Sequence, residues 1–320
     1  MKFYPMPFSP YWLILLAPLL LPVFFLIVNP QAFCQRHDRV VIRKPGCRLL
    51  GPPQPVVPAA RKHVDFALLS QVAYEESLPA EKKEPVKSFA EAAAAVKTAG
   101  WELWPDFPTS ELLTKFTTSH LRVKVWGNYK RNAVAVAFGG TVFNSGKDWK
   151  SNLRWFTFKH QDEYTQLVEL FIPEFIKQFK LLSQKPEWNF LQHATLCATG
   201  HSLGGGLAQE LAYALTLDST VPRITEVYAF DPSPVTGYFS VPADIRDKNK
   251  LTLTTDRIYE RGEILALARS LVSLIVPPSK EEPRVWQYRY NLFSRSPITG
   301  HSISELALRL GDAAAGKLSN

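Results

Sequence analysis

The sequence predicts an α/β protein with a mainly parallel central sheet. Runs of strand length that are expected to be buried occupy residues 133–138, 194–199 and 224–230, and the first is continuously apolar, as expected of a strand buried on both faces. Segments with helical periodicity separate these runs, and each run ends in glycine or a polar residue. Because the carboxyl ends of parallel strands meet at one edge of a sheet, the residues that follow the runs are the first candidates for function.

Composition describes a globular domain and excludes some partners. The chain has 320 residues, 46% hydrophobic and 12% aromatic, and a formal net charge of +8. The basic residues are spread along the chain without interleaved stacking aromatics, so we expect attraction to anionic lipid headgroups rather than nucleic-acid binding. The three cysteines indicate no disulfide framework. Cys197 is expected in the core, while Cys34 and Cys47 could pair after export or stay free thiols.

An uncharged apolar run at residues 11–28 is about long enough to cross a bilayer as a helix. A cleaved signal peptide would need a more basic start than Lys2 and a small-residue cleavage site. We therefore expect residues 1–35 to be an uncleaved single-pass anchor. Basic residues after the run favour a cytoplasmic domain, but export machinery overrides this rule in short segments, so the side of the membrane stays open.

The remaining chain divides into a linker and one domain. Residues 36–62 are rich in proline and basic residues and predict an extended linker, which leaves 63–320 as the domain. Expected helices lie at residues 63–76, 86–99, 162–182, 203–215 and 302–310. Further strands are expected at residues 121–126 and 257–261, with a shorter one at 251–254. Aromatic residues expected to pack over the sheet edge are Trp101, Trp104 and Phe107.

A G-x-S-x-G motif at residues 200–204 lies between a predicted strand and a predicted helix. In that setting the central Ser202 occupies a strained turn that exposes its hydroxyl as a nucleophile. Gly200 and Gly204 flank the serine because a Cβ at either position would crowd the turn. The motif therefore predicts nucleophilic catalysis by Ser202.

A serine nucleophile needs a histidine base and an acid that orients the histidine. In hydrolases with this elbow the chain order is serine, acid, histidine, and His301 alone of the seven histidines lies clearly beyond Ser202. His201, inside the elbow, is expected to point away from the base position. Three acids remain open: Glu263 first, because it follows a predicted strand and a glycine, then Asp231, then Asp256.

The negative oxygen of a tetrahedral intermediate must meet backbone N–H groups. Leu203, the residue after the nucleophile, supplies one such donor. The turn of Gly139, Gly140 and Thr141 follows an earlier strand and is the natural source of the second, with Thr141 as the donor.

Together these segments resemble the class 3 (fungal-type) lipase family of α/β-hydrolases. The segment at 138–141 resembles its F-R-G-[ST] turn, 148–153 its W-x-x-N-L, 200–208 its elbow, 257–265 its strand and acid, and 297–303 its histidine loop. The resemblance spans roughly residues 64–310. It implies an α/β-hydrolase fold with Ser202 as nucleophile, His301 as base, Glu263 as acid, and Thr141 and Leu203 as oxyanion donors.

The sequence also departs from the family pattern. Gly139 replaces an arginine, and Glu263 stands where the family has aspartate. The segment at 229–232 resembles the G-L-D-P of pancreatic-type lipases, which keeps Asp231 in contention. By resemblance residues 142–160 could form a lid, and the apolar run at 264–276 is either a second lid candidate or a core helix.

These observations predict a membrane-anchored serine ester hydrolase of lipase, phospholipase or esterase type. It would act on lipid or acyl esters through an acyl-enzyme intermediate, without a cofactor or metal. Two alternatives are a catalytically inactive hydrolase-fold binding module and an acyltransferase that uses the same triad. Oligomeric state is not predicted.

Overall fold

The computed structural model describes residues 36–74, 83–116, 121–140, 161–216, 220–261, 283–293 and 301–318. The predicted anchor, both lid candidates, Cys34, Thr141 and Glu263 lie outside these residues. Over the described ranges, the helices are too short or too polar for any of them to cross a bilayer.

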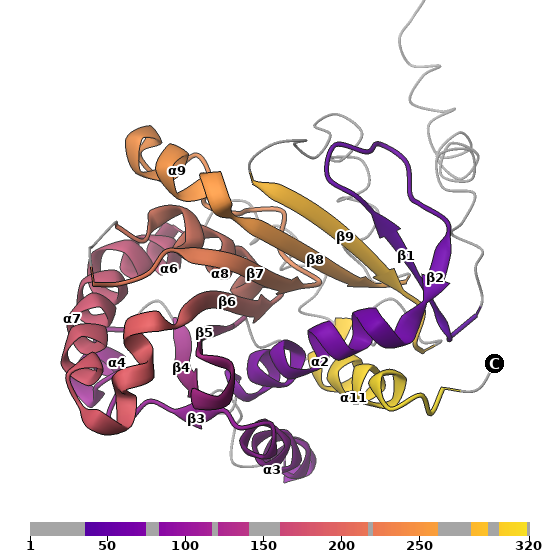
Figure 1. The fold of residues 1–320 in the computed structure, drawn as a ribbon, viewed down its shortest axis with the longest axis horizontal. Helices are drawn as coiled ribbons and strands as arrows, with labels where there is room; N and C mark the ends of the chain where they lie inside the picture. Colours follow the sequence, from indigo (N-terminus) through magenta and orange to yellow (C-terminus); the bar gives the residue numbers. More distant parts are fainter. Residues whose placement is uncertain are drawn as a thin grey trace, which may run out of the picture.

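A central sheet of nine strands organises the described part of the chain, in the order β2-β1-β9-β8-β7-β6-β5-β4-β3 (Figure 1). The strands are β1 Arg39–Arg43, β2 Pro53–Pro55, β3 Glu102–Leu103, β4 Arg122–Asn128, β5 Ala133–Gly139, β6 Thr195–His201, β7 Ile224–Phe230, β8 Thr254–Glu260 and β9 Arg284–Tyr290. Strands β5 to β9 pair in parallel, and the pairings toward both edges are antiparallel. The predicted mixed α/β fold with a mainly parallel sheet is confirmed.

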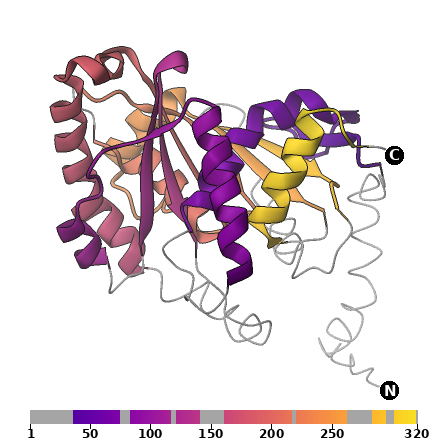
Figure 2. The ribbon, with the colours of Figure 1, turned by 90° about the horizontal axis from the view of Figure 1, so that it is seen from below.

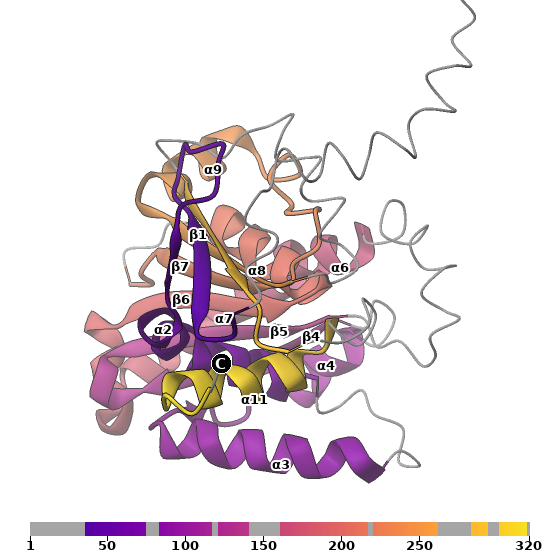
Figure 3. The same ribbon diagram turned by 90° about the vertical axis from the view of Figure 1, so that its right-hand side faces the viewer.

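Helices cover both faces of the sheet. They are α2 Val56–Val72, α3 Lys83–Thr98, α4 Ser110–Phe116, α6 Gln161–Gln166, α7 Ile172–Ser183, α8 Leu203–Ala214, α9 Ala243–Asn249 and α11 Ile303–Ala314, with a π-helical segment Leu167–Phe171 between α6 and α7. Figure 3 shows α2, α3 and α11 on one side of the sheet and α6 and α8 on the other. In Figure 2 the yellow α11 lies across the same face as α2, which it contacts.

Alternation along the central strands divides the core into two layers. Val134 and Val136 of β5 pack toward α7 and α8, whereas Ala135 and Ala137 pack toward α2 and α11. Cys197 is buried in the α2 layer, which confirms its expected place in the core. The continuous apolar run of β5 therefore follows from burial on both faces.

The aromatic residues after α3 pack as expected. Trp101, Trp104 and Phe107 are all buried. Trp104 stacks on Phe175 of α7, with ring centroids 5.5 Å apart and planes within 7°. These rings are part of the core, so the prediction that they pack against the sheet is confirmed.

The linker expected at residues 36–62 is not what the structure contains. Residues 39–43 form β1, which pairs with β9, and α2 begins at Val56, well before the expected start at residue 63. Prolines at the entry of α2 suggested a linker, yet proline fits the first turn of a helix because that turn needs no N–H donor. The prediction was therefore wrong for this segment, which belongs to the domain.

One strand prediction was wrong and one strand was missed in the later part of the sheet. Residues 250–252 form a 3₁₀ turn, so the short strand expected at 251–254 was wrong, and β8 begins only at Thr254. The unpredicted β9 mixes aromatic residues with arginine and glutamine, a composition that a search for apolar runs does not reveal.

Candidate active site

The nucleophile motif forms a sharp turn between β6 and α8. Ser202 is the single residue between them, with φ 57° and ψ −123°, a strained conformation for a residue with a side chain. A Cβ at Gly200 would overlap the backbone of Gly204, and a Cβ at Gly204 would overlap the backbone of β5. Both glycines are thus required by close backbone approach, and the turn has the form expected of a nucleophile elbow.

Residues after β7 hold this elbow in place. The Ser202 N–H donates to the Phe230 carbonyl at 2.9 Å, and the Ser233 N–H donates to the Ser202 carbonyl at 2.9 Å. Asp231 lies between these two contacts, with a φ of 38°. Its own N–H donates to the Ile258 carbonyl of β8 at 2.8 Å. Asp231 is therefore fixed directly beside the elbow.

Three titratable side chains gather at this edge of the sheet. One nitrogen of His201, one carboxylate oxygen of Asp231 and one nitrogen of His301 lie within 4.8 Å of one another, and all three residues are buried. The structure therefore brings the predicted base together with Asp231. Ser202 is only 1% exposed, and its hydroxyl has no hydrogen-bond partner among the described residues.

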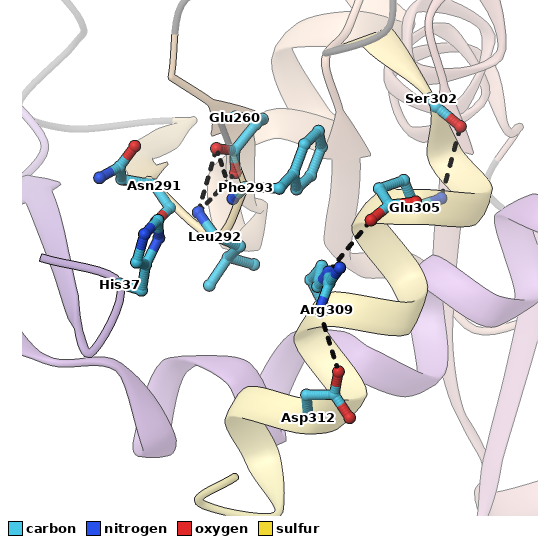
Figure 4. A network of polar contacts seen from close by, with 9 residues as sticks. All are labelled: His37, Glu260, Asn291, Leu292, Phe293, Ser302, Glu305, Arg309 and Asp312. Carbon is cyan, nitrogen blue, oxygen red and sulfur yellow. Dashed lines mark hydrogen bonds and ion pairs between the residues drawn. The ribbon is translucent and has the colours of Figure 1, made fainter. Parts of the chain in front are cut away.

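His301 reaches this cluster from the start of α11. The next residue, Ser302, caps the helix by accepting a hydrogen bond from the Glu305 N–H at 3.4 Å (Figure 4). A serine cap fixes the direction in which the chain enters a helix. Because α11 packs against α2, its N-terminal entry sets the position of His301 relative to the sheet.

His201 does not point away from the base, contrary to expectation. Its ring centroid lies 4.6 Å from that of His301. Its Nδ1 lies 2.9 Å from the hydroxyl of Tyr74, which also donates to the His201 carbonyl at 3.2 Å. Since Thr199 of β6 contacts Ser70 of α2, strand alternation places His201 on that same face, beside α11. The alternation of side chains along β6 would have predicted this orientation of His201, whereas the prediction was made from the G-x-S-x-G motif alone.

Tyr74 links three parts of the site. It follows α2, contacts the elbow through His201, and its hydroxyl oxygen accepts a hydrogen bond from the Gly140 backbone. Burial raises the pKa of its hydroxyl, so Tyr74 stays protonated and neutral at physiological pH. The sequence contained no motif that would have identified this residue.

The turn after β5 lies against the start of the elbow helix. A Cβ at Gly140 would stand 3.2 Å from the Leu203 nitrogen and 2.7 Å from the His201 carbonyl oxygen. The Gly140 carbonyl accepts a hydrogen bond from Arg122 Nη1 at 2.9 Å. The predicted donor Leu203 is thus adjacent to the predicted turn, at a helix N-terminus that favours negative charge. Thr141 lies just beyond the described residues.

Asp256 is excluded as the acid of the cluster. Its carboxylate contacts Lys62 Nζ at 2.6 Å and His63 Nε2 at 3.0 Å, both on α2. Asp256 lies within β8, four residues before the carboxyl end of the strand. The third option for the acid was therefore wrong, because the buried Asp256 carboxylate forms an ion pair with the partly exposed Lys62 and contacts the His63 ring. Glu263, the first option, lies outside the described residues and stays a prediction.

Glu260, at the end of β8, supports Asp231 through its backbone. The Glu260 N–H donates to Asp231 Oδ1 at 3.2 Å, while its carboxyl accepts the N–H groups of Leu292 at 3.0 Å and Phe293 at 3.5 Å (Figure 4). Burial raises the pKa of Glu260 to about 8, against the opposing effect of these N–H groups. Its position at a strand end was a usable signal that sequence reasoning missed.

Comparisons with known proteins return fungal lipase structures. No protein-family model and no curated protein matches the chain in sequence. A fungal lipase–inhibitor complex, presented as a model for interfacial activation, matches at 14% identity, covering 68% of this chain and 73% of the lipase, with a TM-score of 0.39. The Rhizomucor miehei lipase–propeptide complex matches at 14% identity, with coverages of 68% and 63% and a TM-score of 0.38. Lipase from Rhizopus microsporus var. chinensis matches at 15% identity, with coverages of 65% and 68% and a TM-score of 0.40. The chain is thus similar to fungal lipases at low identity and low TM-score.

Proposed function

We propose that the protein is a serine ester hydrolase of the lipase type. The observation that carries this proposal is the strained Ser202 turn beside the Asp231–His301 cluster. In this proposal Ser202 is the nucleophile, His301 the base, and Asp231 the acid that orients His301. The class 3 lipase resemblance of the motifs supports the same reaction.

The reaction follows from these assignments. The Ser202 oxygen attacks the ester carbonyl carbon as His301 takes the hydroxyl proton. The Leu203 N–H, with Thr141 as the second predicted donor, meets the negative oxygen of the tetrahedral intermediate. Collapse of the intermediate breaks the bond to the alcohol, which leaves with the proton from His301. Water then attacks the acyl-serine, His301 again serves as base, and the carboxylic acid is released.

Asp231 takes the acid role on geometric grounds. Its carboxylate has an oxygen within 4.8 Å of a His301 nitrogen. Backbone hydrogen bonds of the nearby residues Phe230 and Ser233 with the elbow serine hold it beside the elbow. The family resemblance assigns this role to Glu263 instead. Substitution of each carboxylate separates the two assignments.

The substrate class proposed is an acyl ester of a lipid. The predicted apolar segment at residues 11–28 and the net charge of +8 favour a location at an anionic membrane surface.

A fluorophosphonate probe tests the proposal without knowledge of the substrate. We expect wild-type protein and the exposed control Ser110→Ala to be labelled and to hydrolyse short p-nitrophenyl esters. Ser202→Ala should lose both properties while keeping its melting temperature. Turnover retained in folded Ser202→Ala would contradict the proposal. Unlabelled wild-type protein would favour the inactive binding module. Acyl transfer to an added alcohol that outcompetes hydrolysis would favour the acyltransferase.

A further inference from the structure

Three arginines share one face of the sheet away from the catalytic cluster. They are Arg43 of β1, Arg257 of β8 and Arg289 of β9, here called the arginine cluster. Gln287 of β9 pairs with both Arg43 and Arg257, and Arg289 follows two residues later on the same face. Tyr288, between them, belongs to the core under α2, so the arginine cluster lies on the opposite face.

Arg43 is buried without an adequate partner. It is 4% exposed, and its Nη1 reaches the Arg48 carbonyl oxygen at 3.4 Å. Its Nε and Nη2 are buried and have no hydrogen-bond partner in the described parts of the chain. A buried guanidinium with two unused N–H groups is costly, because those groups have left water without replacement.

The other two arginines also lack a carboxylate partner among the described residues. Arg257 donates its Nε and Nη2 to the neutral Oε1 of Gln209 on α8, at 3.1 and 2.8 Å. Arg289 is half-buried, and no side chain in the described ranges accepts a hydrogen bond from it or forms an ion pair with it. Three positive charges therefore lie together without a compensating negative charge among the described residues.

These arginines remain cations at neutral pH. Burial, followed by the positive charge of Arg289, lowers the pKa of Arg43 to about 10. Burial also lowers the pKa of Arg289. A lysine or histidine in such surroundings could lose its proton, whereas a guanidinium keeps its charge. The cluster is therefore built to face an anion.

We propose that the arginine cluster is a binding site for a phosphate group. Guanidinium forks match phosphate oxygens in pairs, and a phosphate monoester carries about −1.5 to −2 charges with three strong acceptors. A carboxylate would neutralise one charge of the three. An anionic lipid headgroup and free phosphate share this chemistry, and the experiments below distinguish them.

The proposed phosphate site is separate from the ester-cleaving site. Ser202 ends β6, whereas the cluster is centred on β9, three strands away in the sheet order, or about 14 Å at the usual strand spacing. The phosphate is thus not on the ester bonded to Ser202, and the inference stands whether or not the chain is a hydrolase. The arginine cluster and the ester-cleaving site are linked through β8. Arg257 donates to Gln209 of α8, and the carbonyl of the next residue, Ile258, accepts a hydrogen bond from the Asp231 N–H.

Inorganic phosphate is the first probe. The full chain is melted in increasing phosphate, with sodium chloride keeping the ionic strength constant. We expect a saturable rise in melting temperature for wild type, and a half-saturating concentration at least about tenfold higher for Arg289→Gln, since a charged hydrogen bond is lost. The matched control is Arg284→Gln, an exposed arginine on the same strand, which should behave as wild type. No phosphate effect on wild type, or equal losses in both variants, would overturn the site.

Vesicles distinguish the two sources of phosphate. Flotation compares phosphatidylcholine vesicles with vesicles that also contain about 30 mol% phosphatidic acid. A lipid headgroup ligand predicts more protein on the acidic vesicles for wild type and Arg284→Gln, and loss of that excess for Arg289→Gln. Binding of inorganic phosphate without a vesicle difference identifies the soluble ion and still supports the site. Failure in both arms refutes it.

The substitution Arg43→Met tests independently whether Arg43 lacks a counter-charge in the absence of phosphate. Removing a buried cation that lacks a counter-charge among the described residues should leave the melting temperature in phosphate-free buffer unchanged or higher, and should abolish the rise with phosphate. If Arg43 were instead a structural partner of the fold, the variant would melt lower by the same amount in both buffers. That result would overturn the proposal.

Discussion

Replacing Asp231 by asparagine removes a charge beside His301 while keeping the shape of the side chain. Asparagine also tolerates the positive φ of 38° at this position, so the backbone should persist. At 4.8 Å and an effective dielectric constant of about 20, a carboxylate and an imidazolium attract by about 3.5 kcal/mol, or about 300-fold in rate. Loss of the correct histidine tautomer in the known serine–histidine–aspartate case brings the loss to about 10⁴-fold.

We therefore expect Asp231→Asn to lower kcat for a p-nitrophenyl ester by about 300-fold to 10⁴-fold, with little change in melting temperature. Asp244→Asn, an exposed change of the same kind on α9, should keep wild-type activity. Glu263→Gln is compared in parallel. Full activity in Asp231→Asn together with a large loss in Glu263→Gln would refute the reasoning from the buried cluster.

Three further substitutions test the surroundings of the site. Burial raises the pKa of both Glu210 and Glu260 to about 8, above the ordinary 4.5, so the folded state retains protons that the unfolded state releases. As pH rises from about 4.5 to about 8, the free energy of unfolding measured in urea should therefore fall by up to about 1.4 kcal/mol per pH unit for each group. Glu210→Gln should make this pH dependence less steep. An unchanged pH dependence in Glu210→Gln would contradict the raised pKa of Glu210. Gly200→Ala should prevent stable folding because its Cβ overlaps the Gly204 backbone, and a wild-type melting curve would show that the turn is misplaced. Tyr74→Phe should lower kcat by about fivefold, as expected for the loss of one hydrogen bond of about 1 kcal/mol to His201, and an unchanged kcat would assign the hydroxyl no part in positioning.

The central strands were predictable because their physical requirement is simple. Strands β5, β6 and β7 are covered by helices on both faces, so apolar residues are frequent in them and the runs are visible without structural information. The peripheral strands β1 and β9 each contain two arginines, and prolines follow β1. Their assignment depends on pairing with each other across more than 240 residues of sequence, which local patterns do not encode.

The site was predictable to a similar extent and for similar reasons. Ser202 was identified from a local motif, and His301 from chain order combined with the scarcity of histidines. The acid was not, because three carboxylates follow or lie within neighbouring strands and sequence spacing does not state which way each side chain points. His201 was misjudged on the same ground, since its orientation depends on the phase of β6 relative to α2.

Strand alternation explains why neighbouring polar residues of β8 serve different purposes. Asp256 faces α2 and pairs with Lys62 and His63, whereas the next residue, Arg257, faces α8. A carboxylate on one face of a sheet cannot contact a guanidinium on the other, so Asp256 leaves the arginine cluster uncompensated. Beyond the last residue of a strand this restriction ends. A carboxylate there can reach both the elbow and the start of α11, and Asp231, directly after β7, occupies that position.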